Sequence, residues 1–565
     1  MANFATEKTG GTVNDIIADS CARFADRPAL SLALHEPITY GELLTRVIRV
    51  SALLQDAGIR KKDRVAILGE NSPAWAIAYL ATVRLGAVAV PILPDFPEAD
   101  VRHILTDAKA KMLFTTQRQI EKIYELGSNK IGAIIMLDDS PPEKHLGQIE
   151  TFSVFLARAG QLPAKKLEAA ADPPAVAAGD LCAIIYTSGT SGHSKAVMLS
   201  HGNLFANVHA ANQLLRIMPD WTFLSILPMS HTYEFTIGFL LPLLNGCRIV
   251  YAGKAPTPTT LQRICTREKP SAICMVPMVM EKIYKKRVMT AIDANPLLKL
   301  ACRVPAARRG IYRKIGKKLL DFFGGNLQLV AIGGAAINSE TESFLVEARF
   351  PYLVGYGLTE ASPLLAAGPF RDPTLTVGCT GKPVPGVEIR ISRPDPASGI
   401  GEIMARGPNI MQGYANHPEL TAETIDPAGW LATGDLGRFD SSGNLHIMGR
   451  SKSVIVLSNG ENVYPEAIEE KINACMFVIE SLVVENHDQL EARVYLDYDL
   501  IDQKTKNKTQ SQKREYIDQL LQEIRSGVNS QLASYSKISR IIERQEPFIK
   551  TATHKIKRYL YSEGR

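Results

Sequence analysis

The sequence has little of several features that mark specialised classes of protein. None of its eight cysteines forms a C-x-x-C pair, which argues against a disulfide framework and a zinc site, and we expect free thiols buried in a reducing cytosol. The most apolar run, residues 237–244, is too short to span a bilayer. The first residues lack a basic stretch followed by an apolar one. We therefore expect a cytoplasmic protein.

The sequence also lacks a large excess of positive or negative charge. The 64 lysines and arginines nearly balance the 58 acidic residues, and the formal net charge is +6. Because the basic residues are spread along the chain, composition gives no case for nucleic-acid binding, although anionic small molecules fit it. At 565 residues, with 45% apolar and 22% charged residues, the chain exceeds what one hydrophobic core usually supports. At least two domains are expected.

Short apolar runs alternate with longer segments of helical period. The strand candidates are 64–68, 133–137, 181–185 and 327–332, and the clearest helical segments are 40–58 and 203–215. This alternation predicts an α/β fold with largely parallel sheets. The strand-like segments 445–448 and 454–457 flank the expected domain junction, and an α+β pattern follows it. Within that last part, residues 502–514 contain no apolar residue, which predicts a solvated loop.

A loop rich in glycine and hydroxyl groups follows the buried strand at 181–186. It consists of Thr187, Ser188, Gly189, Thr190, Ser191, Gly192, His193, Ser194 and Lys195. Glycines allow backbone N–H groups to turn inward as an anion nest, the hydroxyls add donors, and the lysine adds positive charge. The spacing does not match the P-loop of NTPases. A flexible surface loop would need neither the buried strand nor the lysine, so we predict a phosphate cradle.

These residues resemble the adenylate-forming superfamily, which contains acyl-CoA synthetases, luciferases and adenylation domains of peptide synthetases. The resemblance begins at residues 38–43, continues through 63–73 and 86–91, and reaches Lys555. It implies a large N-terminal domain over 1–449, a hinge at 450–452 and a small mobile C-terminal domain over 453–565. The cradle departs from the common family form at Ser191, Ser194 and Ala196, and the last is acceptable only where no positive φ is needed.

The resemblance also implies a site for ATP and Mg²⁺ assembled from distant segments. Tyr356 would stack on adenine, Thr359 would touch the α-phosphate, and Glu360, with Thr187, would hold magnesium, which prefers oxygen ligands. Asp435 would accept hydrogen bonds from the ribose, and Arg450 would reach ribose or phosphate oxygens. The remaining residues implied at the nucleotide are Gly333, Gly334, Ala335 and Gly357. Taken alone, each of these motifs is an ordinary turn.

Two half-reactions follow from the same resemblance. In the first, a carboxylate attacks the α-phosphate of ATP, with Lys555 stabilising the developing charge and His231 bordering the carboxylate. In the second, a thiol displaces AMP after the C-terminal domain rotates about Lys452, and Gly460 matches the family's glycine after the hinge. The alternative for the lysine-rich end around Lys555 is a solvated basic tail.

Two stretches, 276–284 and 456–463, look typical of long-chain fatty acyl-CoA synthetases. The leading hypothesis is therefore a fatty acid:CoA ligase that uses coenzyme A. The alternatives are an acyl-AMP ligase that loads a phosphopantetheinyl carrier protein and a non-catalytic acyl or nucleotide sensor. Residues 237–244 would line an acyl tunnel or form helix core. The basic segment 303–318 would lie on the inner membrane surface as a peripheral contact, or form a solvated helix face. The sequence does not specify an oligomeric state.

Overall fold

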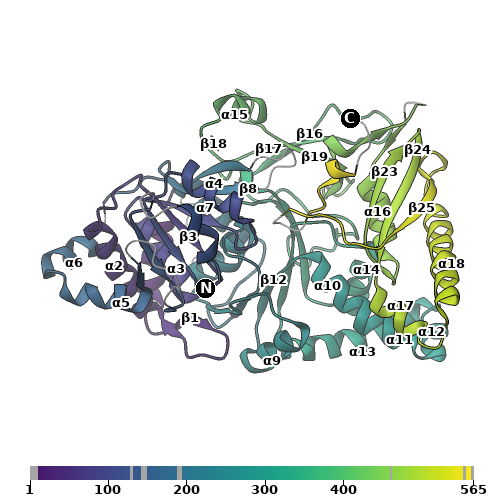
Figure 1. Ribbon diagram of the computed structural model, residues 1–565, viewed down its shortest axis with the longest axis horizontal. Coiled ribbons are helices and arrows are strands. Elements are labelled where there is room, and N and C mark those ends of the chain that lie inside the picture. Colours follow the sequence, from purple (N-terminus) through teal and green to yellow (C-terminus); the bar gives the residue numbers. More distant parts are fainter. Residues whose placement is uncertain are drawn as a thin grey trace.

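The N-terminal part of the protein is built on two eight-stranded sheets, which the ribbon in Figure 1 shows side by side. The computed structural model describes residues 10–126, 131–140, 149–172, 174–187, 194–458, 461–551 and 555–561. Neighbouring strands are mostly parallel, and several are buried along their whole length, as in β4. Parallel sheets covered on both faces have this burial, because crossover helices lie on each side. The expected α/β fold is confirmed.

The first sheet carries the polar segments of the candidate site on its last strands. Its strands, in spatial order, are β15 (Leu364–Ala367), β14 (Tyr352–Gly357), β13 (Leu329–Ile332), β12 (Ala272–Met275), β10 (Thr222–Ser225), β11 (Arg248–Tyr251), β1 (Pro28–Leu32) and β2 (Ile38–Thr39). Only the outermost pairs, β14 with β15 and β1 with β2, are antiparallel.

The second sheet carries the predicted cradle. Its strands, in spatial order, are β18 (Gly413–Tyr414), β9 (Lys195–Ser200), β8 (Leu181–Thr187), β4 (Val88–Ile92), β3 (Arg64–Leu68), β5 (Met112–Thr115), β6 (Ala133–Met136) and β7 (Ile149–Thr151). The expected strand at 64–68 is confirmed residue for residue. Ala196 lies in β9 and is absent from the residues with positive φ, so alanine is compatible with the backbone there.

Helices cover both sheets and begin at recognisable caps. Thr39 caps α2 through a reciprocal pair of bonds with Glu42, and Ser72 caps α3 ahead of Pro73. The N-terminal α-helices are α1 (Val13–Arg23), α2 (Tyr40–Asp56), α3 (Pro73–Arg84), α4 (Glu98–Asp107), α5 (Phe152–Ala157), α6 (Ala164–Ala171), α7 (His201–Asn212), α8 (Leu241–Leu244), α9 (Pro258–Glu268), α10 (Pro277–Ile283), α11 (Thr290–Asp293), α12 (Pro296–Ala301), α13 (Pro305–Phe322), α14 (Ser339–Ala348) and α15 (Pro418–Thr424).

Shorter helical segments complete this part of the chain. They are the 3₁₀ turns η1 (Ile120–Leu126), η2 (Arg158–Gln161) and η5 (Thr359–Ala361), and the π-helices η3 (Glu234–Leu240) and η4 (Tyr284–Met289). The apolar run at 237–244 forms part of η3 and α8. Phe239 is fully buried and packs on Phe235, which in turn packs on Trp75 and Tyr79. These rings belong to the helix core, the second of the two alternatives for this run.

A third, antiparallel sheet is formed by strands between residues 388 and 450, shortly before the C-terminal part. It consists of β16 (Glu388–Ser392), β17 (Gly401–Arg406), β19 (Leu431–Phe439) and β20 (Leu445–Arg450). The 3₁₀ turn η6 (Ser451–Ser453) follows β20 and contains the exposed Lys452. The assignment of 450–452 as a hinge and the two domain boundaries stay predictions.

The C-terminal part has its own hydrophobic core, with members from Ile455 to Ile541. Its elements are β21 (Ile455–Val456), β22 (Asn462–Val463), α16 (Pro465–Ala474), β23 (Val478–Asn486), β24 (Gln489–Leu496), α17 (Tyr498–Lys504), α18 (Gln510–Asn529), η7 (Ser534–Ser536), β25 (Ile538–Arg544) and η8 (Arg558–Leu560). This is the expected small α+β region. α16 contacts α14 and β20 and so joins it to the N-terminal part.

The prediction of one solvated loop over 502–514 is wrong. α17 extends to Lys504, and α18 begins at Gln510, where Thr509 and Gln512 form a reciprocal cap. Most of these polar residues lie on the solvent-facing ends of the two helices, where a helix can form without burying apolar side chains. The cap supplies the missing partners of the first backbone N–H groups.

All eight cysteines are free, and six of them are buried, while Cys302 and Cys475 are half-buried. This agrees with the expected free thiols. Within the described ranges, no helix combines the length and the apolar content that crossing a bilayer requires.

Candidate active site

Tyr356, Asp435 and Arg450 form a polar cluster where β14 meets the third sheet, in which the tyrosine and the aspartate are buried and the arginine is exposed. The antiparallel register of β19 and β20 places Asp435 directly opposite Arg450, whose Nε lies 2.8 Å from Oδ1 of the carboxylate. Tyr356 donates its phenolic hydrogen to the other oxygen, Oδ2, at 2.8 Å. Burial raises the pKa of Asp435, and Arg450 opposes this rise. Two separate strands therefore hold one carboxylate in a fixed orientation.

Glu360 lies in the turn η5, directly after β14, and has an unexpected partner. Tyr414 of β18 donates its phenolic hydrogen to Oε1 of Glu360 at 2.8 Å, and the same ring carries the Nζ of Lys195 4.9 Å from its centroid. β18 pairs with β9, which places Tyr414 opposite Val197. Tyr414 thus connects the predicted metal ligand with the predicted phosphate lysine.

Sequence reasoning missed Tyr414. Its contacts depend on the pairing of β18 with β9 and on its approach to Glu360, which lies 54 positions earlier in the chain. A Gly-Tyr pair before a helix has no local signal that distinguishes it from an ordinary turn.

The ends of the predicted cradle are described, and its centre is not. Thr187 and Lys195 are paired in the antiparallel register of β8 and β9, so the two ends of the predicted cradle lie side by side. Ser188, Gly189, Thr190, Ser191 and Gly192 lie outside the described residues, as do Gly460 and His554. β9, which begins at Lys195, contacts η5, the turn that contains Thr359 and Glu360.

Thr359 and the segment 333–335 border the same region. Thr232 donates a hydrogen bond to Oγ1 of Thr359 at 3.4 Å. Gly334 has a φ of +88°, a left-handed conformation that favours glycine. A Cβ on Gly333 would lie 3.4 Å from the ring of Tyr233. The segment that includes Ala335 therefore runs close to the residues that follow His231.

At Gly357 the surrounding backbone leaves no room for a side chain. A Cβ at this position would lie 1.9 Å from the carbonyl oxygen of Pro363. Only glycine fits here, between Tyr356 and Glu360.

His231 and Lys555 lie near each other, although 324 positions separate them in the chain. Burial lowers the pKa of His231 to about 4, and the positive charge of Lys555 acts in the same direction. The Nδ1 atom of His231 accepts a hydrogen bond from the backbone N–H of Tyr233 at 3.2 Å. A neutral imidazole whose Nδ1 is an acceptor carries its hydrogen on Nε2. His231 is therefore an uncharged donor at neutral pH.

Lys555 meets the charged groups of the site from the C-terminal part. Loss of hydration lowers its pKa, Arg450 lowers it further, and the carboxylates of Asp435 and Glu360 oppose both effects. Lys555 keeps an exposed surface, so water still reaches the side chain among these surrounding groups. Two hydrogen bonds with Thr551 hold its backbone, Thr551 N–H to the Lys555 carbonyl at 2.8 Å and Lys555 N–H to the Thr551 hydroxyl at 3.2 Å.

The lysine-rich end is not a solvated basic tail. Lys550 forms an ion pair with Glu480, and Arg558 forms ion pairs with Glu466 and Glu469 of α16. These contacts anchor the strand of chain that carries Lys555 to the C-terminal core.

The donor set suits a magnesium ion that is held mainly by a nucleotide. Within the described ranges, no three His, Cys, Asp or Glu side chains are placed so that they could hold a metal ion by themselves. Mg²⁺ commonly takes one or two carboxylates together with phosphate oxygens and water. Glu360, oriented by Tyr414, fits that requirement.

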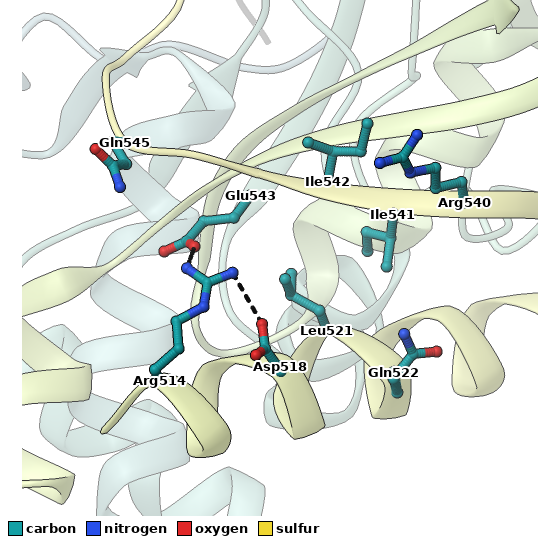
Figure 2. Close-up of a pocket in the computed structure, with 9 residues that line it drawn as sticks. All are labelled: Arg514, Asp518, Leu521, Gln522, Arg540, Ile541, Ile542, Glu543 and Gln545. Carbon is teal, nitrogen blue, oxygen red and sulfur yellow. Dashed lines mark hydrogen bonds and ion pairs between the residues drawn. The ribbon is translucent and has the colours of Figure 1, made fainter. Parts of the chain in front are cut away.

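A separate pocket of about 480 Å³ lies between α18 and β25, and Figure 2 shows its lining residues. Arg514 in this pocket already pairs with Asp518 at 2.9 Å and with Glu543. None of the predicted site residues lines it. The pocket therefore lies apart from the cluster around Asp435, and one of its two arginines, Arg514, is already satisfied by two carboxylates.

Comparison with known proteins matches most of the chain. Residues 17–415 match the family described as "AMP-binding enzyme", and residues 452–563 match its C-terminal domain. The human long-chain-fatty-acid–CoA ligase ACSBG1 is 28% identical over 503 residues, covering 84% of this chain and 68% of that protein. The Drosophila melanogaster long-chain-fatty-acid–CoA ligase heimdall is 29% identical over 511 residues, covering 82% and 72%.

Solved structures share the fold over nearly the whole chain. ATP-bound MatB from Rhodopseudomonas palustris superposes with a TM-score of 0.73 at 25% identity, covering 97% of this chain and 98% of that one. The anthranilate CoA ligase AuaEII in complex with anthranoyl-AMP superposes with a TM-score of 0.78 at 21% identity, covering 98% and 97%.

Proposed function

The chain belongs to the AMP-binding enzyme family, and from that premise we propose that it is an AMP-forming acid–thiol ligase that converts a long-chain fatty acid to its coenzyme A thioester. The observation that carries the proposal is the position of Lys555. Its charge interacts with those of Glu360, Asp435 and Arg450, which come from three other segments of the chain. Similarity to long-chain-fatty-acid–CoA ligases supports the choice of acid and thiol.

In the proposed first step, a carboxylate oxygen of the fatty acid attacks the α-phosphorus of ATP, and pyrophosphate leaves. Negative charge gathers on the phosphate oxygens, and the ammonium of Lys555 stabilises it, together with the donors of the cradle. Bound through Glu360, Mg²⁺ would neutralise phosphate charge. Asp435 holds the ribose, Arg450 supports it, and Tyr356 borders the adenine. His231 donates from Nε2 to the acid's carboxylate without adding a charge of its own.

In the proposed second step, the sulfur of coenzyme A attacks the carbonyl carbon of the acyl-adenylate, the C–O bond to AMP breaks, and AMP leaves. Rotation about Lys452 withdraws Lys555 and admits the thiol. Because a long-chain acid partitions into lipid, we place its collection at the surface of a bilayer.

A pyrophosphate-release assay over acids from acetate to oleate tests the proposal. We expect the highest kcat/KM with a long-chain acid, formation of acyl-CoA when coenzyme A is added, and loss of pyrophosphate release in Lys555→Met. A maximum at acetate or at an aromatic acid would refute the fatty-acid assignment. Transfer to a phosphopantetheinyl carrier protein but not to free coenzyme A would refute the choice of thiol. Absence of acid-dependent ATP–pyrophosphate exchange would indicate a non-catalytic sensor.

A further inference from the structure

One edge of the molecule combines exposed leucines with an unusual concentration of positive charge. Leu297 and Leu300 of α12 are 77% and 60% exposed, and Val304, just before α13, is 56% exposed. They are among the most exposed large apolar side chains of the described residues. Soluble surfaces rarely group large apolar side chains in this way without a partner.

The helices α12 and α13, residues 296–322, carry eight cations and one acidic residue, Asp321. Between residues 296 and 320 stand Lys299, Arg303, Arg308, Arg309, Arg313, Lys314, Lys317 and Lys318, with neither aspartate nor glutamate. These eight charges exceed the net charge of +6 of the whole chain, so the rest of the protein is slightly acidic. The positive charge is therefore local to this edge.

Most of these cations are not used to hold the fold together. Lys299 pairs with Asp293 at 2.9 Å and Arg308 pairs with Glu347 at 2.6 Å. The other six cations have no ion-pair partner within the described ranges. Charges left facing water in one group favour a partner of opposite charge.

The packing of α13 decides which way the charges face. Its inner side lies against α14, and a Cβ on Gly316 would lie 2.9 Å from the Cβ of Ala348. Arg309, Arg313 and Lys317 are exposed and recur every four residues, along one stripe of the helix. α12 contacts α13, so the exposed leucines adjoin the N-terminal end of this stripe.

We propose that this edge, the docking face formed by α12 and the outer side of α13, binds the surface of an anionic lipid bilayer. The proposal rests on the proposed function, because only a lipid-soluble acid gives the enzyme a reason to visit a bilayer. Leu297, Leu300 and Val304 enter the interface between headgroups and acyl chains, while Arg309, Arg313 and Lys317 contact lipid phosphates. Charge complementarity selects this occupant over a second copy, since two copies of the face would bring like charges together.

Vesicle co-sedimentation of the full-length protein tests the proposal without measuring catalysis. We expect binding to vesicles that contain phosphatidylglycerol, much weaker binding to phosphatidylcholine alone, and weakening with added salt, which screens charge. The triple variant Arg309→Gln, Arg313→Gln, Lys317→Gln should lower the affinity by about tenfold or more, since each cation near an anionic surface contributes to binding. The double variant Leu297→Ser, Leu300→Ser should lower the affinity for vesicles both without and with added salt.

Matched controls come from the opposite end of the long axis in Figure 1, where α2 and α6 lie. Arg49→Gln, Lys62→Gln and Lys165→Gln remove the same charge from exposed positions there. Val154→Ser removes an exposed apolar side chain of α5. All control variants should bind vesicles as the unmodified protein does.

The outcomes separate this proposal from the proposed function. Equal binding by surface and control variants, or no binding to anionic vesicles, would overturn the docking face. So would a dimer in light scattering that the leucine variant converts to monomer, because the face would then serve a second copy. Selective loss of vesicle binding supports the docking face even if no acid gives pyrophosphate release. All these variants should retain the pyrophosphate release of the unmodified protein with a short, water-soluble acid.

Discussion

Lys285 donates a hydrogen bond from Nζ to the backbone carbonyl oxygen of Val478, 2.8 Å away, across the junction of the N-terminal and C-terminal parts. The same ammonium donates to the carbonyls of Asn473 at 2.5 Å and Cys475 at 3.0 Å, around the end of α16. A positive charge suits this end of a helix, where carbonyl groups lack partners. The other end of α16 pairs with Arg558, three residues after Lys555. One helix therefore joins Lys285 to the segment that carries Lys555.

Lys285→Met should slow adenylation more than thioester formation. The substitution removes the hydrogen bonds that Lys285 donates to three carbonyls and should weaken the domain orientation that we propose brings Lys555 to the nucleotide. We expect pyrophosphate release to fall by about tenfold, which corresponds to about 1.4 kcal/mol. The rate of thioester formation from supplied acyl-adenylate should stay within about twofold of the unmodified rate. The hydrogen bonds of Lys285 belong to the domain orientation described here, and rotation of the C-terminal domain would break them before the thiol reacts.

The exposed neighbour Lys286 provides the control for this prediction. Lys286→Met removes the same charge one position away and should leave both half-reactions unchanged. Equal slowing of both steps in Lys285→Met would contradict a role specific to one domain orientation.

Tyr356→Phe should raise the KM for ATP by about fivefold, as expected for the loss of one hydrogen bond of about 1 kcal/mol to Asp435, the carboxylate that we propose binds the ribose. Steady-state kinetics at saturating fatty acid measure this change. Tyr352→Phe is the matched control, because Tyr352 lies on the same strand and donates to Glu342 at 3.1 Å, outside the cluster around Asp435. A similar rise in the control would show that β14 as a whole, and not the bond to Asp435, had been disturbed.

His201 should make the fold sensitive to acid. Its ring is fully buried, both ring nitrogens lack a hydrogen-bond partner among the described residues, and burial lowers its pKa from 6.5 to about 4. As the pH falls below 6.5, the unfolded chain takes up this proton first, so stability is lost between pH 6.5 and about pH 4.

His201→Gln should remove part of this loss. Between pH 7 and pH 5 the unmodified protein should lose about 2 kcal/mol more stability than the variant, by linkage of one buried histidine. Urea denaturation at the two pH values measures the difference. The exposed His35 serves as control, and His35→Gln should follow the unmodified protein. Identical pH dependence in all three proteins would exclude His201 as the cause.

Gly357→Ala should destabilise the protein by at least about 2 kcal/mol, because backbone must move to admit the methyl group. It should also displace Tyr356 and Glu360 and so lower activity. Gly310→Ala lies on the exposed side of α13 with nothing within 4 Å of the added Cβ. That change should raise stability by about 0.5–1 kcal/mol, the usual gain from alanine in a helix. Comparable thermal stability of the two variants would contradict the close approach to Pro363.

Much of the fold could be predicted from local patterns. The strand at 64–68 matches β3 residue for residue, and the helix expected over 40–58 ends at Asp56. Buried strands and amphipathic helices can be predicted because apolar residues recur with the period of each element. The loop predicted over 502–514 was wrong because a helix whose first residues are all polar does not show that period.

For the candidate site, the difference between what the sequence determined and what the tertiary structure decided is larger. The sequence identified the candidate residues, among them Thr187, Glu360, Asp435 and Lys555, because each belongs to a short contiguous motif. Tertiary structure alone decided that Tyr414 holds Glu360, that Lys285 holds α16, and that Lys555 lies among the charges of three other segments. These relationships depend on strand register and on helix packing between distant segments. A one-dimensional pattern does not encode distances across such contacts, and only the folded chain brings the groups together.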